Sequence, residues 1–214
     1  MEKTAIVIGA SGLVGQALVN ELVDSPAYTR IHCITRRPLT LRHDKIHNTV
    51  IDFEQLEHSA DQFRGDCLFS CLGTTRKQVG SVAAQRRIDL DYQFHAAQLA
   101  AQQGVDHYVL VSAMGANPRS RSAYMQMKGE LETRVATLGF ARMSIFQPSL
   151  LTGDRDHKRP AEDLSAPLLS GLCKLPGLRK YRPIAATELA RAMLQCSLRE
   201  GAAIEHYPLD RCFP

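Results

Sequence analysis

The fold of this chain is decided by the stretch Thr4-Ala-Ile-Val-Ile-Gly-Ala-Ser-Gly-Leu-Val-Gly15. Four apolar residues run into three glycines spaced G-x-x-G-x-x-G, and an apolar, periodic segment over residues 13–23 follows. This order is typical of a strand, a tight turn and a helix. Because a helix N-terminus presents free N–H groups to an anion, the pattern predicts a site for a dinucleotide pyrophosphate. A tight turn that binds no ligand is the alternative interpretation.

The three glycines have separate roles in a loop of this kind. Gly9 lets the chain turn where a Cβ would clash, Gly12 lets the backbone approach the phosphates, and Gly15 lets the helix pack closely on the strand. The residues on either side of Gly12, Ser11 and Leu13, are expected to contact the same ligand.

Composition points to an ordinary globular protein. The chain has 214 residues, of which 44% are hydrophobic and 22% charged, and its formal net charge is +4. These values predict a single domain over residues 1–214. The basic residues are not interleaved with aromatic ones, so we expect no nucleic acid as a partner. The six cysteines form no C-x-x-C pair and the histidines are scattered, so no metal site is predicted.

Two features bear on the location of the protein. No segment approaches the roughly 18 apolar residues of a membrane span. The first predicted strand starts close to the N-terminus, which leaves no room for a secretory leader. We therefore expect no membrane association and a cytoplasmic location.

Apolar runs alternate with helical stretches along the chain. Strands are expected at Ala5–Ile8, Ile31–Thr35, Thr49–Asp52, Cys67–Cys71, Tyr108–Ser112 and Met143–Gln147. Helices are expected at Leu13–Val23, Gln55–Gln62, Ala83–Gln103, Ser122–Leu138 and Thr187–Ser197. The alternation predicts an α/β fold, a Rossmann-type doubly wound parallel sheet. Residues 153–183, rich in charges and prolines, are expected to form a small C-terminal substrate lobe or lid with one short helix.

The end of the second predicted strand bears on which dinucleotide fits. A site that prefers NAD usually carries an acid there, which accepts from the ribose 2′-OH. This chain has Arg36 and Arg37 instead, and two guanidinium groups would bind a 2′-phosphate. We therefore expect the cofactor NADP(H), with a solvated pair of loop arginines as the alternative.

The ends of the third and fourth predicted strands also face the expected ligand. Asp52 is expected to meet the adenine amino group, or else it caps the next helix. Cys71, Leu72 and Gly73 are expected to pass close to the adenosine ribose and diphosphate. For Gly73 a simple tight turn is the alternative, because these roles follow from position along the chain.

Tyr124 and Lys128 lie four residues apart in a predicted helix and therefore share one face. An ammonium group beside a phenol stabilises the phenolate, so such a pair suits proton transfer to a carbonyl near neutral pH. Ser112, at the end of the fifth predicted strand, is in a position to donate to the same oxygen. A chance surface pair is the alternative for the tyrosine and lysine alone.

Together these residues resemble the short-chain dehydrogenase/reductase superfamily, over residues 1–150 and again at Arg182–Ala190. The glycine spacing is that of its extended and atypical branches. Three runs are similar to the small branch that includes the Tat-interacting oxidoreductase-like proteins, namely Cys71–Arg76, Lys128–Glu130 and Gln147–Leu151.

The resemblance implies roles for single residues. Tyr124 is the general acid/base, Lys128 supports it and holds the nicotinamide ribose, and Ser112 polarises the carbonyl. Pro148 and Leu150, with the serine between them, line the nicotinamide end of the site.

One departure from the family pattern concerns the serine. Many relatives carry two or three hydroxyl residues in a row after the fifth strand, whereas this chain has Ser112-Ala113-Met114. If the reactive position is 113 or 114, the serine has been lost and polarisation rests on Tyr124 alone.

Three functions fit this sequence. The first is an NADP(H)-dependent oxidoreductase that transfers hydride to or from a small carbonyl or alcohol substrate. The second is an NADPH-sensing regulatory or interaction protein with little turnover. The third is a sugar-nucleotide epimerase, which the short segment after the sixth predicted strand disfavours. The oligomeric state is open, with a homodimer as one option.

Overall fold

The computed structural model describes residues 2–153 and 182–213. Its main strands span Lys3–Ile8 (β1), Tyr28–Thr35 (β2), Ile46–Val50 (β3), Cys67–Ser70 (β4), His107–Val111 (β5), Arg142–Gln147 (β6) and Ile204–Pro208 (β9). They form one parallel seven-stranded sheet in the order β3-β2-β1-β4-β5-β6-β9. The order reverses direction between β1 and β4, which creates the crevice of a doubly wound fold. The predicted fold class is confirmed.

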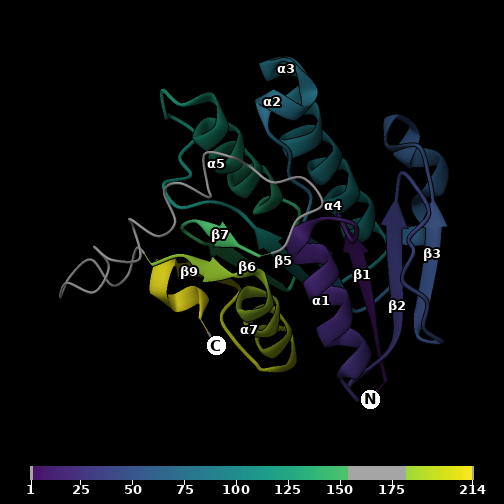
Figure 1. Ribbon diagram of the computed structural model, residues 1–214. Coiled ribbons are helices and arrows are strands. Elements are labelled where there is room, and N and C mark those ends of the chain that lie inside the picture. Colours follow the sequence, from purple (N-terminus) through teal and green to yellow (C-terminus); the bar gives the residue numbers. More distant parts are fainter. Residues whose placement is uncertain (1, 154–181, 214) are drawn as a thin grey trace.

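Helices cover both faces of this sheet, with α1 and α7 on one face and η1, α4 and α5 on the other (Figure 1). The helical elements are α1 (Leu13–Asp24), η1 (Phe53–Phe63), α2 (Arg76–Val79), α3 (Val82–Arg86), η2 (Arg87–Asp91), α4 (Tyr92–Gln102), α5 (Ala123–Val135), α7 (Ala186–Leu198) and η4 (Leu209–Cys212). A second, two-stranded sheet pairs β7 (Leu151–Thr152) with β8 (Ile184–Ala185) in parallel.

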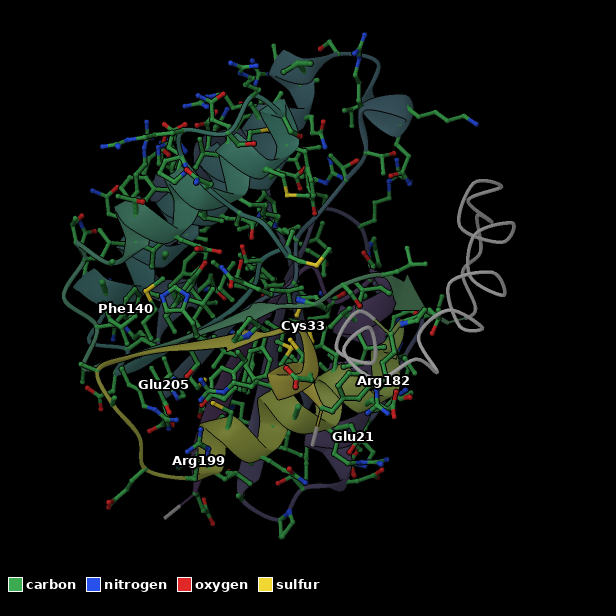
Figure 2. All side chains as sticks on the ribbon, turned by 90° about the vertical axis from the view of Figure 1, so that its left-hand side faces the viewer. Glu21, Cys33, Phe140, Arg182, Arg199 and Glu205 are labelled. Carbon is green, nitrogen blue, oxygen red and sulfur yellow. The ribbon has the colours of Figure 1, made fainter. Side chains whose placement is uncertain are left out.

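Sequence periodicity explains how the layers bury their apolar groups. In α1, Val14, Leu18 and Leu22 recur every four residues and all face the core. All five residues of β5 are buried, as a strand covered on both faces requires. Figure 2 shows side chains filling both faces, with Cys33 inside and Glu21 toward the outside. Each fully buried aliphatic side chain contributes about 1.5–3 kcal/mol.

Three differences from the predicted elements bear on the site and on the edge of the sheet. The third strand ends at Val50, so Asp52 lies outside it. The helical segment predicted from 83 to 103 contains a π-helical turn, Arg87–Asp91, between α3 and α4. Strand β9 was not predicted, because it is an edge strand with an exposed Ile204 and a polar sequence rather than an apolar run.

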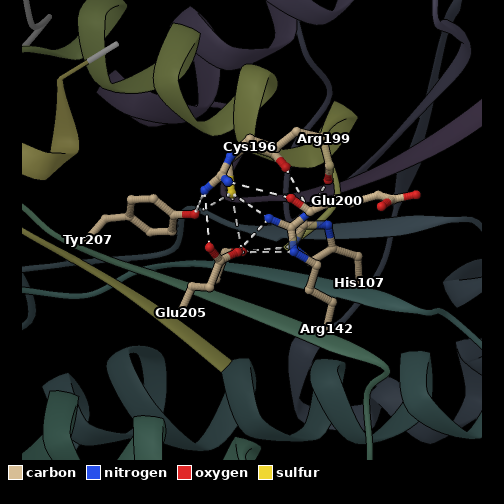
Figure 3. A network of polar contacts seen from close by, with 8 residues as sticks. His107, Arg142, Cys196, Arg199, Glu200, Glu205 and Tyr207 are labelled. Carbon is tan, nitrogen blue, oxygen red and sulfur yellow. Dashed lines mark hydrogen bonds and ion pairs between the residues drawn. The ribbon is translucent and has the colours of Figure 1, made fainter. Parts of the chain in front are cut away.

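A polar network attaches β9 to the rest of the sheet (Figure 3). Arg142, the first residue of β6, donates to the Glu205 carboxylate at 2.6 and 3.2 Å and to the Cys196 carbonyl at 3.0 Å. Nearby, the His107 ring and the Ser144 hydroxyl are 2.9 Å apart. Because His107 and Arg142 are the first residues of β5 and β6, the network stabilises the sheet at the amino ends of these strands and leaves the opposite end free for a ligand.

Most of the predicted substrate lobe, residues 153–183, lies outside the described residues, as does its expected short helix. Strands β7 and β8 border this segment on its two sides. None of the helices in the described ranges is long and apolar enough to cross a membrane.

Candidate functional site

A cleft of about 730 Å³ lies where the carboxyl ends of the central strands meet. Its wall is formed by the segments that follow β1, β4, β5 and β6, together with α5. This is the place where doubly wound sheets bind their ligands. The cleft brings together most of the predicted site residues: Ser11, Gly12, Leu13, Cys71, Leu72, Gly73, Ser112, Tyr124, Lys128, Pro148 and Leu150.

The glycine loop fits a bound pyrophosphate because two of its glycines allow no side chain. Gly9 has φ +80°, and a Cβ there would lie 2.5 Å from the carbonyl carbon of Cys71. A Cβ on Gly15 would lie 2.1 Å from the Gly9 oxygen. Gly12 is the N-cap of α1 and lines the cleft, so it brings no side chain between the helix N-terminus and a ligand. Gly9 and Gly15 therefore lie beneath the loop and shape it, while Gly12 faces the cleft.

The buried carboxylate of Asp89 supports the loop after β4 through a hydrogen bond. Asp89 is fully buried in the π-helical turn, and its Oδ1 accepts a hydrogen bond of 2.9 Å from the Thr74 backbone N–H. A Cβ on Gly73 would meet only Asp89 Oδ1, at 3.7 Å, so sterics do not demand a glycine there. Asp89 thus sets the path of this loop along the cleft.

Lys128 is anchored within the wall of the cleft. Its side chain is 2% exposed, and its Nζ donates to the Val111 carbonyl at 3.1 Å. Tyr124, one helical turn earlier in α5, is half-buried and lines the same cleft. Burial raises the pKa of the nearby Cys71 thiol to about 12, against the opposing charge of Lys128. Cys71 is therefore protonated at neutral pH and is not a nucleophile.

Ser112 lies on the cleft but directs its hydroxyl elsewhere. The residue is 4% exposed, and its backbone N–H donates to the Phe146 carbonyl at 2.7 Å, which continues the β5–β6 pairing. Its hydroxyl donates to the Glu132 carboxylate in a short hydrogen bond. Gln147 donates to the same carboxylate at 3.0 and 3.2 Å. Glu132 is a site residue that sequence reasoning missed, although it lies one further turn along the helix from Lys128.

Besides Gly9 and Gly15, which lie beneath the loop, three predicted residues are not part of the cleft wall formed by the described residues. Arg36 and Arg37 are exposed directly after β2, beside the carboxyl end of β1. Asp52 is the N-cap of η1, and its side chain accepts from the Glu54 backbone N–H at 2.9 Å. The capping role that was the alternative for Asp52 is therefore the contact that the structure has.

Several residues of the wall were not predicted, and they come mainly from the loop after β4 and the segment around α5. They are Val14, Gln16, Thr74, Thr75, Arg76, Gln78, Gln85, Val111, Ala113, Met114, Met125 and Leu151. One signal was readable, because Thr75-x-x-Gln78 has capping-box spacing and forms that box at the start of α2. Across residues 2–153 and 182–213, no cluster of three or more His, Cys, Asp or Glu side chains could hold a metal ion.

A doubly wound parallel sheet with this glycine loop and a Tyr–Lys pair on one cleft defines a dinucleotide-binding protein of the short-chain dehydrogenase/reductase type. Residues 9–160 match the family model described as NAD(P)H-binding, and the chain belongs to that family. The resemblance to the extended and atypical branches of the superfamily is thereby confirmed.

Curated relatives agree over nearly the whole chain. Protein HTATIP2 of Rattus norvegicus is 38% identical over 221 residues, which cover 97% of this chain and 90% of that protein. Protein FMP52, mitochondrial, of Coccidioides immitis (strain RS) is 32% identical over 210 residues, covering 91% and 85%.

Solved structures share the fold at low sequence identity. MoeE5 in complex with UDP-glucose and NAD superposes with a TM-score of 0.73 and 18% identity, covering 95% of this chain and 74% of that one. UDP-glucose 4-epimerase from Thermotoga maritima has a TM-score of 0.73 and 12% identity, covering 96% and 76%. At these identities the likeness demonstrates the fold alone.

These comparisons contradict the expectation of a cytoplasmic location, which is wrong. Relatives between 32% and 34% identical carry the word mitochondrial in their names. The sequence argument tested for a secretory leader and a membrane span, and import into an organelle requires neither.

Proposed function

We propose that the protein is an NADP(H)-dependent oxidoreductase that moves hydride between the cofactor and a small carbonyl or alcohol substrate. The observation that carries this proposal is the shared cleft: Tyr124 and Lys128 line the same cavity as the glycine loop at the start of α1. A phosphate cradle and a proton-transfer pair on one wall are what this chemistry requires.

The chain offers residues for both ends of the cofactor. Ser11, Gly12 and Leu13 would hold the pyrophosphate at the α1 N-terminus, and Pro148 and Leu150 would line the nicotinamide end. When bound, the nicotinamide supplies or accepts the hydride.

Proton transfer falls to the residues of α5. In reduction, Tyr124 gives its phenol proton to the carbonyl oxygen as that oxygen gains negative charge. The Lys128 ammonium, fixed by its bond to the Val111 carbonyl, stabilises the phenolate that remains. In oxidation the same phenolate removes the proton of the alcohol.

The experiment measures NADPH oxidation against a panel of small ketones and aldehydes with the wild type and with Tyr124→Phe. Loss of turnover in Tyr124→Phe, with NADPH affinity unchanged, supports the oxidoreductase. Tight NADPH binding without turnover on any carbonyl refutes it and favours a sensor. The Ser112–Glu132 hydrogen bond is the observation that keeps the sensor as a second candidate, because it engages one of the expected catalytic groups.

The preference for NADP(H) over NAD rests on Arg36 and Arg37 and has its own test. The double change to alanine removes the charge-assisted hydrogen bonds expected with the 2′-phosphate, each of which contributes roughly 1.5–3 kcal/mol. We expect NADPH affinity to fall at least tenfold and NADH affinity to stay nearly constant, measured by fluorescence titration. An equal loss for both cofactors would refute the 2′-phosphate argument.

A sugar-nucleotide epimerase is the third candidate function, and an assay can distinguish it from the oxidoreductase. Solved neighbours include proteins whose names mention UDP-sugars, and this chain covers about three quarters of their length. Interconversion of UDP-glucose and UDP-galactose without net NADPH consumption would favour this function over the oxidoreductase.

A further inference from the structure

Ser112 and Glu132 form a hydrogen bond at the edge of the cleft. Ser112 belongs to the cleft wall, whereas Glu132 and Gln147 are not among the residues that line the cleft. The serine hydroxyl donates to Glu132, and the Gln147 amide donates to both oxygens of the same carboxylate. The serine therefore both lines the cleft and donates to a carboxylate outside its wall.

The partners of Glu132 distinguish it from its neighbour on the helix. Glu130 forms ion pairs of 2.7 Å with Arg86 and Arg134. Within the described ranges, Glu132 has hydrogen bonds from two neutral donors and no ion pair. The Ser112 hydroxyl therefore donates to a carboxylate that has no cation beside it within the described ranges, and a hydrogen bond to a carboxylate is charge-assisted.

A serine hydroxyl has one proton and two lone pairs. While the Ser112 hydroxyl donates its proton in a hydrogen bond to Glu132, it has only lone pairs left and nothing to donate to a second acceptor. A ketone or aldehyde oxygen also carries no proton, so the two oxygens cannot form a hydrogen bond with each other. Polarisation of the carbonyl then falls to Tyr124.

We propose that Glu132 is a positioning residue that turns the hydroxyl proton of Ser112 away from the substrate, so that Tyr124 alone donates to the carbonyl oxygen. This inference rests on the proposed reductase function. It gives the Ser112-Ala113-Met114 run a physical meaning, because the serine is present in the wall but is withdrawn from the reaction.

The experiment compares kcat, KM and NADPH affinity for four variants of the full chain. Ser112→Ala is expected to change kcat less than about threefold, whereas removal of one donor to a developing oxyanion lowers kcat by roughly 10²–10³. Glu132→Leu removes the acceptor and is expected to raise kcat about tenfold or more, because Ser112 can then donate to the substrate. The double variant is expected to lose this gain. Glu130→Gln, on the same helix, is the matched control and leaves kcat unchanged.

Dependence on Ser112 separates positioning from a structural role. A variant that merely loosens α5 would lower kcat with or without the serine and would also weaken NADPH binding. Glu132→Gln is the second variant in case Glu132→Leu does not fold, since a neutral amide accepts more weakly and should give a smaller gain of the same sign.

Two results would overturn the proposal, and they differ in what they say of the function. If Ser112→Ala lowers kcat a hundredfold in a protein that Tyr124→Phe inactivates, the reductase stands and the role of Glu132 is wrong. If neither the wild type nor Glu132→Leu reduces any carbonyl while both bind NADPH, the proposed function and this inference both fail.

Discussion

Replacement of Gly129 by alanine has two opposing effects on stability. Alanine favours the helix more than glycine does, whereas its methyl group disturbs the tertiary packing. Gly129 lies inside α5, between Lys128 and Glu130, with its backbone against the loop that precedes the helix. A Cβ at this position would lie 2.4 Å from the Asn117 carbonyl carbon and 2.4 Å from the Pro118 nitrogen. Ordinary contact begins at about 3.4 Å, so the helix or the loop must move by about 1 Å.

The two effects have opposite signs and can be compared. Alanine in a helix interior is about 0.8–1 kcal/mol more favourable than glycine. An extra methyl group in a well-packed place costs about 1–3 kcal/mol, and here it meets backbone that has little freedom to yield. We therefore expect Gly129→Ala to lower the free energy of unfolding by roughly 1–2 kcal/mol, which lowers Tm by about 2–8 °C in a chain of this length.

The assay is urea unfolding followed by circular dichroism, together with kcat and NADPH affinity. Because the shift of α5 moves Tyr124 relative to the cofactor, kcat should fall more than NADPH affinity. Gln126→Ala, an exposed change on the same helix, is the control and should leave stability nearly unchanged. A Gly129→Ala protein that is more stable than the wild type would refute the packing argument.

Three further predictions concern other parts of the molecule. Gly15→Ala should weaken NADPH binding at least tenfold in calorimetry while the chain stays folded, because its Cβ would lie 2.1 Å from the Gly9 oxygen; unchanged affinity would contradict the proposed cradle. Burial, and then the charge of Arg142, lower the pKa of His107 from 6.5 to about 4, so protonation favours the unfolded state. Stability should be full above pH 6.5 and fall by on the order of 3 kcal/mol toward pH 4, and His107→Gln should flatten this part of the urea profile. With a pKa near 12, Cys71 should react with iodoacetamide at pH 7 far more slowly in the native protein than in urea, and equal rates would contradict the raised pKa of the thiol.

Much of the fold follows from local patterns in the sequence. The apolar run before Gly9 and the spacing of the apolar residues in α1 each require one kind of element, and the alternation of such elements requires a parallel sheet. The bounds of α1 agree with the prediction to within one residue. Strand β9 was not predicted from the sequence, because an edge strand that is held by the Arg142–Glu205 ion pair needs no apolar run. Its pairing partner, β6, is also distant in the chain.

The candidate site likewise has a part that the sequence determined and a part that only the tertiary structure decided. Sequence by itself determined the glycine loop and the Tyr124–Lys128 pair, because fixed spacing on one turn or one helix face places such groups without knowledge of the rest of the chain. Tertiary structure alone decided that Asp89 supports the loop after β4 and that Ser112 donates to Glu132. These contacts join segments 15 and 20 residues apart, and the direction of a hydroxyl proton depends on which acceptor the packing brings beside it.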